Sequence, residues 1–223
     1  MTEESIRNEV RYCETLNRVL PKNIRAIAWM PLSNPEFSAR FDCRERTYRY
    51  FFPRGDLDVD AMQKAAQYLV GSHDFRNLCK MDVGNGVVTF ERAIQSAKII
   101  PTTTLEGESP CDMFYLELVG KAYLWHQVRC IMAILLLVGQ RNEQPEIVRD
   151  LLDVERNPCT PQYSLASDAA LNLFNVEYEP CSTSTVSTNI EQNTERLEWI
   201  YDKINLERVL IILQGQWTGY SVK

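Results

Sequence analysis

The stretch MFYLELVGKAYLWHQVRCIMAILLLV, residues 113–138, contains both kinds of element from which the predicted fold is built. Its first part, residues 113–119, is rich in aromatic and aliphatic side chains, which favours a strand. Residues 124–138 form a long and strongly apolar run, which predicts a buried helix. A sheet that packs against this helix is therefore the expected core of the fold.

The same signals predict further strands and helices on both sides of this stretch. Strands are expected at residues 24–30, 46–52, 90–101 and 171–178, and the third of these forms a long hairpin with 113–119 through the polar loop 102–112. Helices are expected at residues 12–19, 58–69, 145–154 and 197–213. Asp58 is the expected N-cap of the second helix and Gly71 its stop signal. These elements predict an α+β fold, a mixed, mostly antiparallel sheet with helices packed on one face.

The chain is expected to fold as one large domain with an appendage. Residues 1–180 carry most of the predicted elements and form the main domain. Residues 181–196 are rich in Ser, Thr and Asn, which predicts a polar flexible insertion. Residues 197–223 form a C-terminal helical segment, and residues 84–86 (Gly-Asn-Gly) a flexible loop.

Composition excludes several classes of protein. The apolar share of 45% and the charged share of 24% are those of an ordinary soluble globular protein. The seven cysteines are odd in number and never spaced C-x-x-C, which argues against a disulfide scaffold and a zinc site. Reduced thiols in the nucleus or cytoplasm are expected instead. The start has no apolar signal region, and the longest apolar run, residues 130–138, is too short for a membrane span.

The charge is unevenly distributed along the chain. A net charge of -6 argues, taken alone, against a nucleic-acid partner. Residues 40–54, however, carry five arginines against two acids, a local balance of +3. The acids gather in residues 143–155 and 191–207. A local basic surface is therefore compatible with RNA binding despite the acidic total.

An aromatic strand lies inside this basic segment. The two-residue period of a strand places Tyr48, Tyr50 and Phe52 on one face and Arg49 on the other. Tyr48 with Arg46 and Arg49 beside it could offer a stacking face for a base and cations for phosphates. The alternative is that the three aromatic side chains are simply one side of a hydrophobic sheet.

Arg129 lies in the otherwise apolar helix predicted at residues 124–138. A guanidinium stays protonated, so it must reach solvent, a phosphate or a carboxylate. One interpretation is an arginine near the helix start whose side chain extends to solvent. The other is a buried partner for a catalytic acid, with His126 lining the same site from three residues earlier. His73, Asp74 and Cys79 form a weaker candidate group, in which capping is the expected role of Asp74.

Four sequence motifs occur in an order that is typical of one enzyme family. FSARF at residues 37–41, followed by YRY at 48–50, resembles the F-x-A-R-F…R-x-Y-x-Y signature of TruA-type pseudouridine synthases. LVGSHDF at residues 69–75 resembles the family's L-x-G-x-H/N-D-F turn, and AYLWHQVR at 122–129 its A-F-L-x-H-x-V-R helix start. The sequence between the motifs is similar to that of the eukaryotic branch of the family, which modifies uridines 38 and 39 of the tRNA anticodon arm.

The resemblance implies a reaction and roles for particular residues. The reaction is the isomerisation of uridine to pseudouridine without a cofactor or a metal, and the partner is the anticodon stem-loop of tRNA. Tyr48 would hold the flipped base and transfer a proton at C5, and Arg129 would pair with the nucleophilic aspartate. Arg46 and His126 would contact the substrate. The chain would form half of a larger two-part catalytic domain around an RNA cleft.

The departure from the family pattern concerns the nucleophile itself. The family carries its aspartate in a G-R-T-D-K/A-G-V motif upstream of the matched segment, and that motif does not occur in these residues. The chain is therefore expected to be the C-terminal part of the catalytic domain and to be inactive alone. Two alternatives stay open at this point, a tRNA-binding module that never catalyses and a structural domain whose aromatic strand is core.

Overall fold

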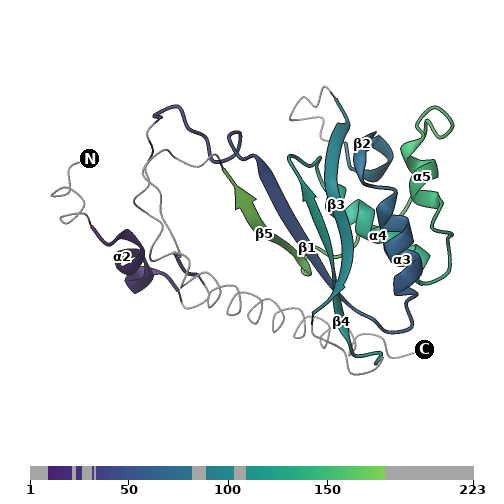
Figure 1. The fold of residues 1–223 in the computed structure, drawn as a ribbon, viewed down its shortest axis with the longest axis horizontal. Coiled ribbons are helices and arrows are strands. Elements are labelled where there is room, and N and C mark those ends of the chain that lie inside the picture. Colours follow the sequence, from purple (N-terminus) through teal and green to yellow (C-terminus); the bar gives the residue numbers. More distant parts are fainter. Residues whose placement is uncertain are drawn as a thin grey trace. The chain divides into compact units, whose positions relative to one another are not determined.

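Five strands of the described chain form one sheet with the order β2-β3-β4-β1-β5 (Figure 1). The structure is a computed structural model that describes residues 10–21, 24–26, 32, 34–81, 89–102 and 109–178. The strands are β1 (Glu45–Pro53), β2 (Gly71–Asp74), β3 (Glu91–Pro101), β4 (Met113–Gly120) and β5 (Leu171–Glu177). All pairings between these strands are antiparallel. The hairpin expected between residues 90–101 and 113–119 is confirmed as β3 and β4.

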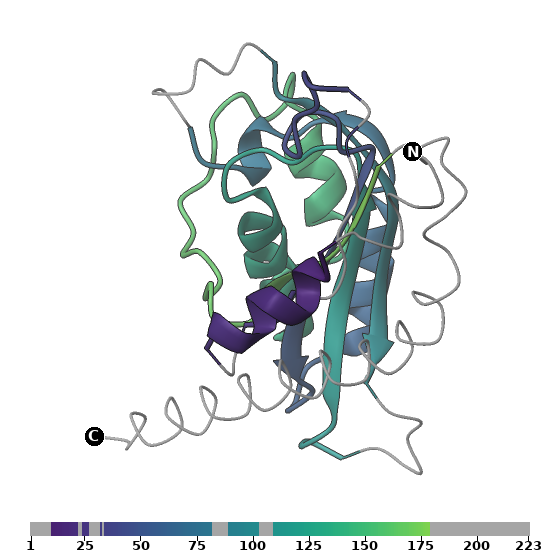
Figure 2. The same ribbon diagram turned by 90° about the vertical axis from the view of Figure 1, so that its left-hand side faces the viewer.

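Three helices cover one face of the sheet, as Figures 1 and 2 show: α3 (Val59–Gln67), α4 (Gln127–Gly139) and α5 (Ile147–Leu152). Almost every side chain of α4 is buried, because this apolar helix lies in the middle of the core. The helices and the antiparallel sheet together confirm the α+β class.

The two-residue period of β1 sorts its side chains between the two faces of the sheet. Tyr50 and Phe52 are almost fully buried in the main core, and Tyr48 packs at the margin of that core. Phe51 faces the other side, where it forms a small cluster with Met113. Tyr48 has Leu118 of β4 and Leu173 of β5 as its neighbours across the sheet.

The ends of three helices differ from the sequence prediction, and the simplest case is α5 (Ile147–Leu152), which is shorter than the expected 145–154. Asp58 does cap α3, because its carboxylate accepts a hydrogen bond from the Ala61 amide at 3.0 Å. The helix ends at Gln67, before Gly71, which has φ +118 and begins the short strand β2 instead. Helix α4 starts at Gln127 rather than at residue 124, because His126 adopts a left-handed conformation (φ 58) that breaks the helical path.

Residues 1–37 belong to a separate compact unit that contains α2 (Tyr12–Val19), a helix with the bounds that the sequence predicts. Of the strand expected at residues 24–30, the described residues 24–26 are not in a strand, and 27–30 lie outside the described residues. The loop 84–86, the insertion 181–196 and the helix 197–213 also lie outside them. Among the described helices, none has the length and hydropathy that crossing a membrane requires.

Candidate active site

Tyr48 lies on the face of β1 that the helices cover, and its side chain is only half-buried. Its ring meets the ring of Tyr123 edge to face, with 5.0 Å between the centroids and an interplanar angle of 84°. Burial raises the pKa of the Tyr48 phenol, and the charge of Arg46 acts against that shift. The interpretation as a hydrophobic sheet face therefore holds for Tyr50 and Phe52, whereas the stacking role of Tyr48, a partly accessible and neutral phenol, stays a prediction.

Arg129 lies in the first turn of α4 and is half-buried among apolar neighbours. Its Nε donates a hydrogen bond to the Ala166 carbonyl oxygen at 2.7 Å. This bond holds Arg129 to a backbone group, and the carboxylate partner that the resemblance implies stays a prediction. No ion pair joins Arg129 to a carboxylate within the part of the chain that the structure describes.

The hydrogen bond of Arg129 leaves the outer side of its guanidinium unused. Only Nε takes part in a hydrogen bond among the described residues, so Nη1 and Nη2 make none there. These two nitrogens form the planar fork that binds a carboxylate through two parallel hydrogen bonds. The geometry therefore fixes Arg129 from one side and presents a carboxylate-binding edge on the other.

The charge of Arg129 acts on two further side chains, Tyr50 and His126. Burial raises the pKa of Tyr50 to about 12, although the positive charge of Arg129 opposes the shift. Burial, Arg129 and Lys80 together lower the pKa of His126. The exposed Asp168 acts on both groups with the opposite sign. Asp168 follows Ala166 by two residues, and nothing in its sequence context singles it out.

His126 is placed beside Arg129 by the left-handed turn that precedes α4. Its ring stacks on that of Trp125, with 4.3 Å between the centroids and an angle of 26° between the planes. Its Nδ1 is buried and has no hydrogen-bond partner among the described residues. The lowered pKa keeps the imidazole neutral near pH 7. A neutral ring with one unused nitrogen is compatible with the substrate contact predicted for His126.

Arg46 contacts backbone rather than another side chain. Its Nη1 donates to the carbonyl oxygen of Lys121 at 2.6 Å, and its Nη2 donates to that of Arg40. These bonds join the FSARF segment, residues 37–41, to the turn that precedes α4. The structure thus gives Arg46 a tethering role between two of the motifs, and its contact with substrate stays a prediction.

Arg49 does not share a site with Tyr48, because the two residues face opposite sides of the sheet. Its guanidinium forms an ion pair with Glu117 at 2.9 Å, and the two side chains are only 15% and 20% exposed. It also stacks 3.4 Å from the centroid of the Phe174 ring. The expectation that Arg49 and Arg46 both supply cations beside Tyr48 is wrong for Arg49.

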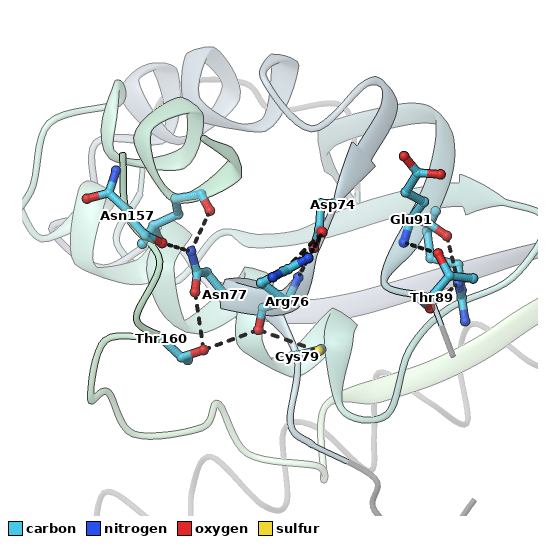
Figure 3. Close-up of polar contacts among 10 residues, drawn as sticks. Asp74, Arg76, Asn77, Cys79, Thr89, Glu91, Asn157 and Thr160 are labelled. Atoms are coloured by element: carbon cyan, nitrogen blue, oxygen red, sulfur yellow. Dashed lines mark hydrogen bonds and ion pairs between the residues drawn. The ribbon is translucent and has the colours of Figure 1, made fainter. Parts of the chain in front are cut away.

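A buried asparagine holds the segment that leads to Ala166. Asn77 lies in the 3-10 turn η1 (Arg76–Leu78) and is fully buried. Its Nδ2 donates to the carbonyl oxygens of Leu151, at 3.1 Å, and Asn157, at 2.8 Å (Figure 3). Thr160 donates to its Oδ1 at 3.2 Å (Figure 3). These bonds span about 80 residues of sequence, so no local pattern could have predicted them.

A tyrosine and a salt bridge complete this network. The Tyr163 hydroxyl donates to the Asn77 carbonyl oxygen at 2.8 Å. Figure 3 also shows Asp74, which accepts from the Arg76 amide at 3.0 Å and from its guanidinium at 2.6 Å. The expected helix-capping role of Asp74 is wrong, because Phe75 is the N-cap of η1 and has no side-chain cap bond, and Asp74 instead closes a local turn onto Arg76. Asn77 therefore holds residues 157–163 in place. These residues lead to Ala166, whose carbonyl oxygen accepts the hydrogen bond from Arg129.

Replacing Asn77 by alanine should destabilise the fold strongly. The change leaves buried carbonyl groups without a donor and opens a cavity, so the free energy of unfolding should fall by about 2–4 kcal/mol. Urea unfolding measures this fall. Asn157→Ala is the matched control, because its side chain donates one exposed hydrogen bond, to the Asp150 carbonyl, and should cost less than about 1 kcal/mol. Equal losses for the two variants would contradict the role of Asn77.

Comparison with known proteins gives a consistent set of matches. A family model described as tRNA pseudouridine synthase matches residues 65–179, a range that includes Tyr123, His126 and Arg129. The chain is 48% identical over 219 residues to the human tRNA pseudouridine(38/39) synthase, which covers 96% of this chain and 42% of the relative. The Saccharomyces cerevisiae protein of the same name is 45% identical over 171 residues, which is 76% of this chain and 37% of that protein.

The mouse tRNA pseudouridine(38/39) synthase is 47% identical over 224 residues, or 99% of this chain and 43% of the relative. The chain thus spans less than half the length of these three curated relatives. Tyr48 and Arg46 lie outside the range of the family model. Both belong to the aromatic strand β1, which the sheet places against the matched strand β4.

Proposed function

Because the chain belongs to the tRNA pseudouridine synthase family, we propose that it supplies part of an active site that isomerises uridine to pseudouridine in tRNA. The observation that carries this proposal is the free carboxylate-binding edge of Arg129, held in a half-buried position by Ala166. An aspartate whose carboxylate binds to this edge would keep a low pKa, because the guanidinium favours its charged form. Such a carboxylate is the nucleophile that the resemblance implies.

The reaction conserves every atom of the substrate. The bond between N1 of uracil and C1′ of the ribose breaks, the base turns, and a new bond joins C5 to C1′. The proton on C5 is then lost and N1 gains one. A base inside a duplex or stacked loop must leave its stack before these steps are possible. The site must therefore hold a flipped uracil against the carboxylate.

Tyr48 is suited to two of these tasks. Its half-buried ring provides a face or edge for the uracil, and its neutral hydroxyl can relay the C5 proton. His126 offers a neutral ring whose buried Nδ1 is unused among the described residues. Arg129 orients the carboxylate and stays charged. Within the described residues, no group of three or more potential metal ligands lies together.

Turnover requires the aspartate motif in addition to this chain. The 223 residues contain no G-R-T-D sequence, so the proposal assigns catalysis to a complete enzyme, meaning a polypeptide that joins residues 1–223 to a segment carrying that motif. In such an enzyme the chain provides Tyr48, His126 and Arg129, and the added segment provides the nucleophile.

The target within tRNA is proposed from the relatives. The human, mouse and yeast relatives are named for uridines 38 and 39, and their identity to this chain supports the same positions, in the anticodon arm. Carbodiimide labelling and primer extension of unmodified tRNA treated with the complete enzyme would map the product. Stops one nucleotide 3′ of uridine 38 or 39, where reverse transcriptase halts before the labelled base, are expected. Stops confined to other uridines would overturn the positional proposal and leave the reaction standing.

A further inference from the structure

Tyr123 carries a buried hydroxyl that the fold does not use. The residue lies in the connection between β4 and α4, and its ring packs against the main core. Its hydroxyl oxygen is buried and has no hydrogen-bond partner among the described residues. A Cβ atom added at Gly120 would lie 3.2 Å from this oxygen, so the hydroxyl lies close to Gly120, a residue without a side chain.

Packing alone does not explain this hydroxyl. A buried hydroxyl without a partner lowers folding stability, whereas a phenylalanine ring fills the same space without that loss. The motif pattern that residues 122–129 resemble has phenylalanine at this position. The oxygen atom therefore adds no hydrogen bond to the described part of the fold.

The surroundings of the hydroxyl indicate what kind of group it would bind. The ring of Tyr123 meets that of Tyr48 edge to face at 5.0 Å between centroids, so the two rings are in direct contact. Burial raises the pKa of Tyr123, the neighbouring Tyr48 and Glu45 act in the same direction, and the charge of Arg46 acts against that shift. The group is thus a neutral hydroxyl, which suits an uncharged acceptor better than a phosphate, whose preferred partners are cations.

We propose that Tyr123 contacts the substrate, and that its hydroxyl donates a hydrogen bond to a carbonyl oxygen of the uracil held beside Tyr48. This inference rests on the proposed function, because it requires a pyrimidine next to Tyr48. Binding the base then provides the partner that the free protein lacks. The contact would add to the specificity for uracil, because the hydroxyl of Tyr123 would bind the edge of the base while Tyr48 contacts its ring.

Tyr123→Phe in the complete enzyme tests the inference, because it removes one oxygen atom and keeps the ring. The expected result is a fall in kcat/KM of roughly 10-fold for unmodified tRNA, as for the loss of one hydrogen bond. The melting temperature should be unchanged or higher, because an unpaired buried hydroxyl is gone. Tyr68→Phe is the matched control, since it removes a phenolic oxygen from a half-buried residue at the end of α3. The control should keep the wild-type rate.

The outcomes separate this inference from the proposed function. A wild-type rate for Tyr123→Phe, within about twofold, would overturn the substrate contact and leave the proposed function intact. A lower rate together with a lower melting temperature would also overturn it, because the hydroxyl would then support the fold. A wild-type complete enzyme that forms no pseudouridine would overturn the proposed function, and the inference with it.

Discussion

Replacing Arg129 by methionine in the complete enzyme is expected to reduce kcat by about 200- to 5,000-fold, the equivalent of breaking a buried ion pair worth about 3–5 kcal/mol. Methionine keeps the apolar stem of the side chain but has no guanidinium. The nucleophilic aspartate would then lack its partner, and its pKa should rise. Tritium release from tRNA labelled at C5 of uridine measures the loss under single-turnover conditions.

The stability of the same variant separates a catalytic from a structural role. The hydrogen bond from Arg129 Nε to the Ala166 carbonyl is lost, so the free energy of unfolding of the 223-residue chain should fall by only about 1–2 kcal/mol. Arg141→Met is the matched control, because Arg141 is exposed beyond the other end of α4. That variant should keep its activity. Normal turnover by Arg129→Met, or a far larger loss of stability, would show that Arg129 is structural.

Replacing Tyr48 by phenylalanine should reduce the single-turnover rate by about 100- to 10,000-fold, the range of a lost proton-transfer group. The affinity for tRNA should change little, because the phenyl ring can still stack on a base and still meet the ring of Tyr123. Filter binding gives the Kd, and tritium release gives the rate. A weaker Kd with a normal rate would reassign Tyr48 from chemistry to binding.

The regular parts of the fold could be predicted from the sequence because their patterns are local. The alternation in β1 correctly separates Tyr50 and Phe52, in the core, from Arg49, on the other face. The strand β2 could not be predicted, because Gly71–Asp74 has four residues and no apolar alternation. The true start of α4 depends on the left-handed backbone of His126, a conformation that side-chain periodicity does not report.

Residues of the site could be predicted only where the type of a residue differs from that of its neighbours in the sequence. Arg129 attracts notice as a charge in an apolar helix, and Tyr48 as an aromatic residue in a basic segment. Asn77 and the Ala166 carbonyl escape notice, because their importance comes from hydrogen bonds between residues 37 to 80 positions apart. Three stretches resemble the eukaryotic branch particularly closely, residues 46–53, 76–83 and 157–164. Hydrogen bonds join Asn77 of the second stretch to Asn157 and Thr160 of the third. Their chemistry could not be read from that resemblance.

The most direct test of the central claim is tritium release from tRNA labelled at C5 of uridine, measured for the complete enzyme and for residues 1–223 alone. The claim is that this chain supplies Tyr48 and Arg129 to a pseudouridine synthase whose nucleophile lies in another segment. The predicted result is release by the complete enzyme and none above background by residues 1–223. Release by residues 1–223 alone, or none by the complete enzyme, would contradict the claim.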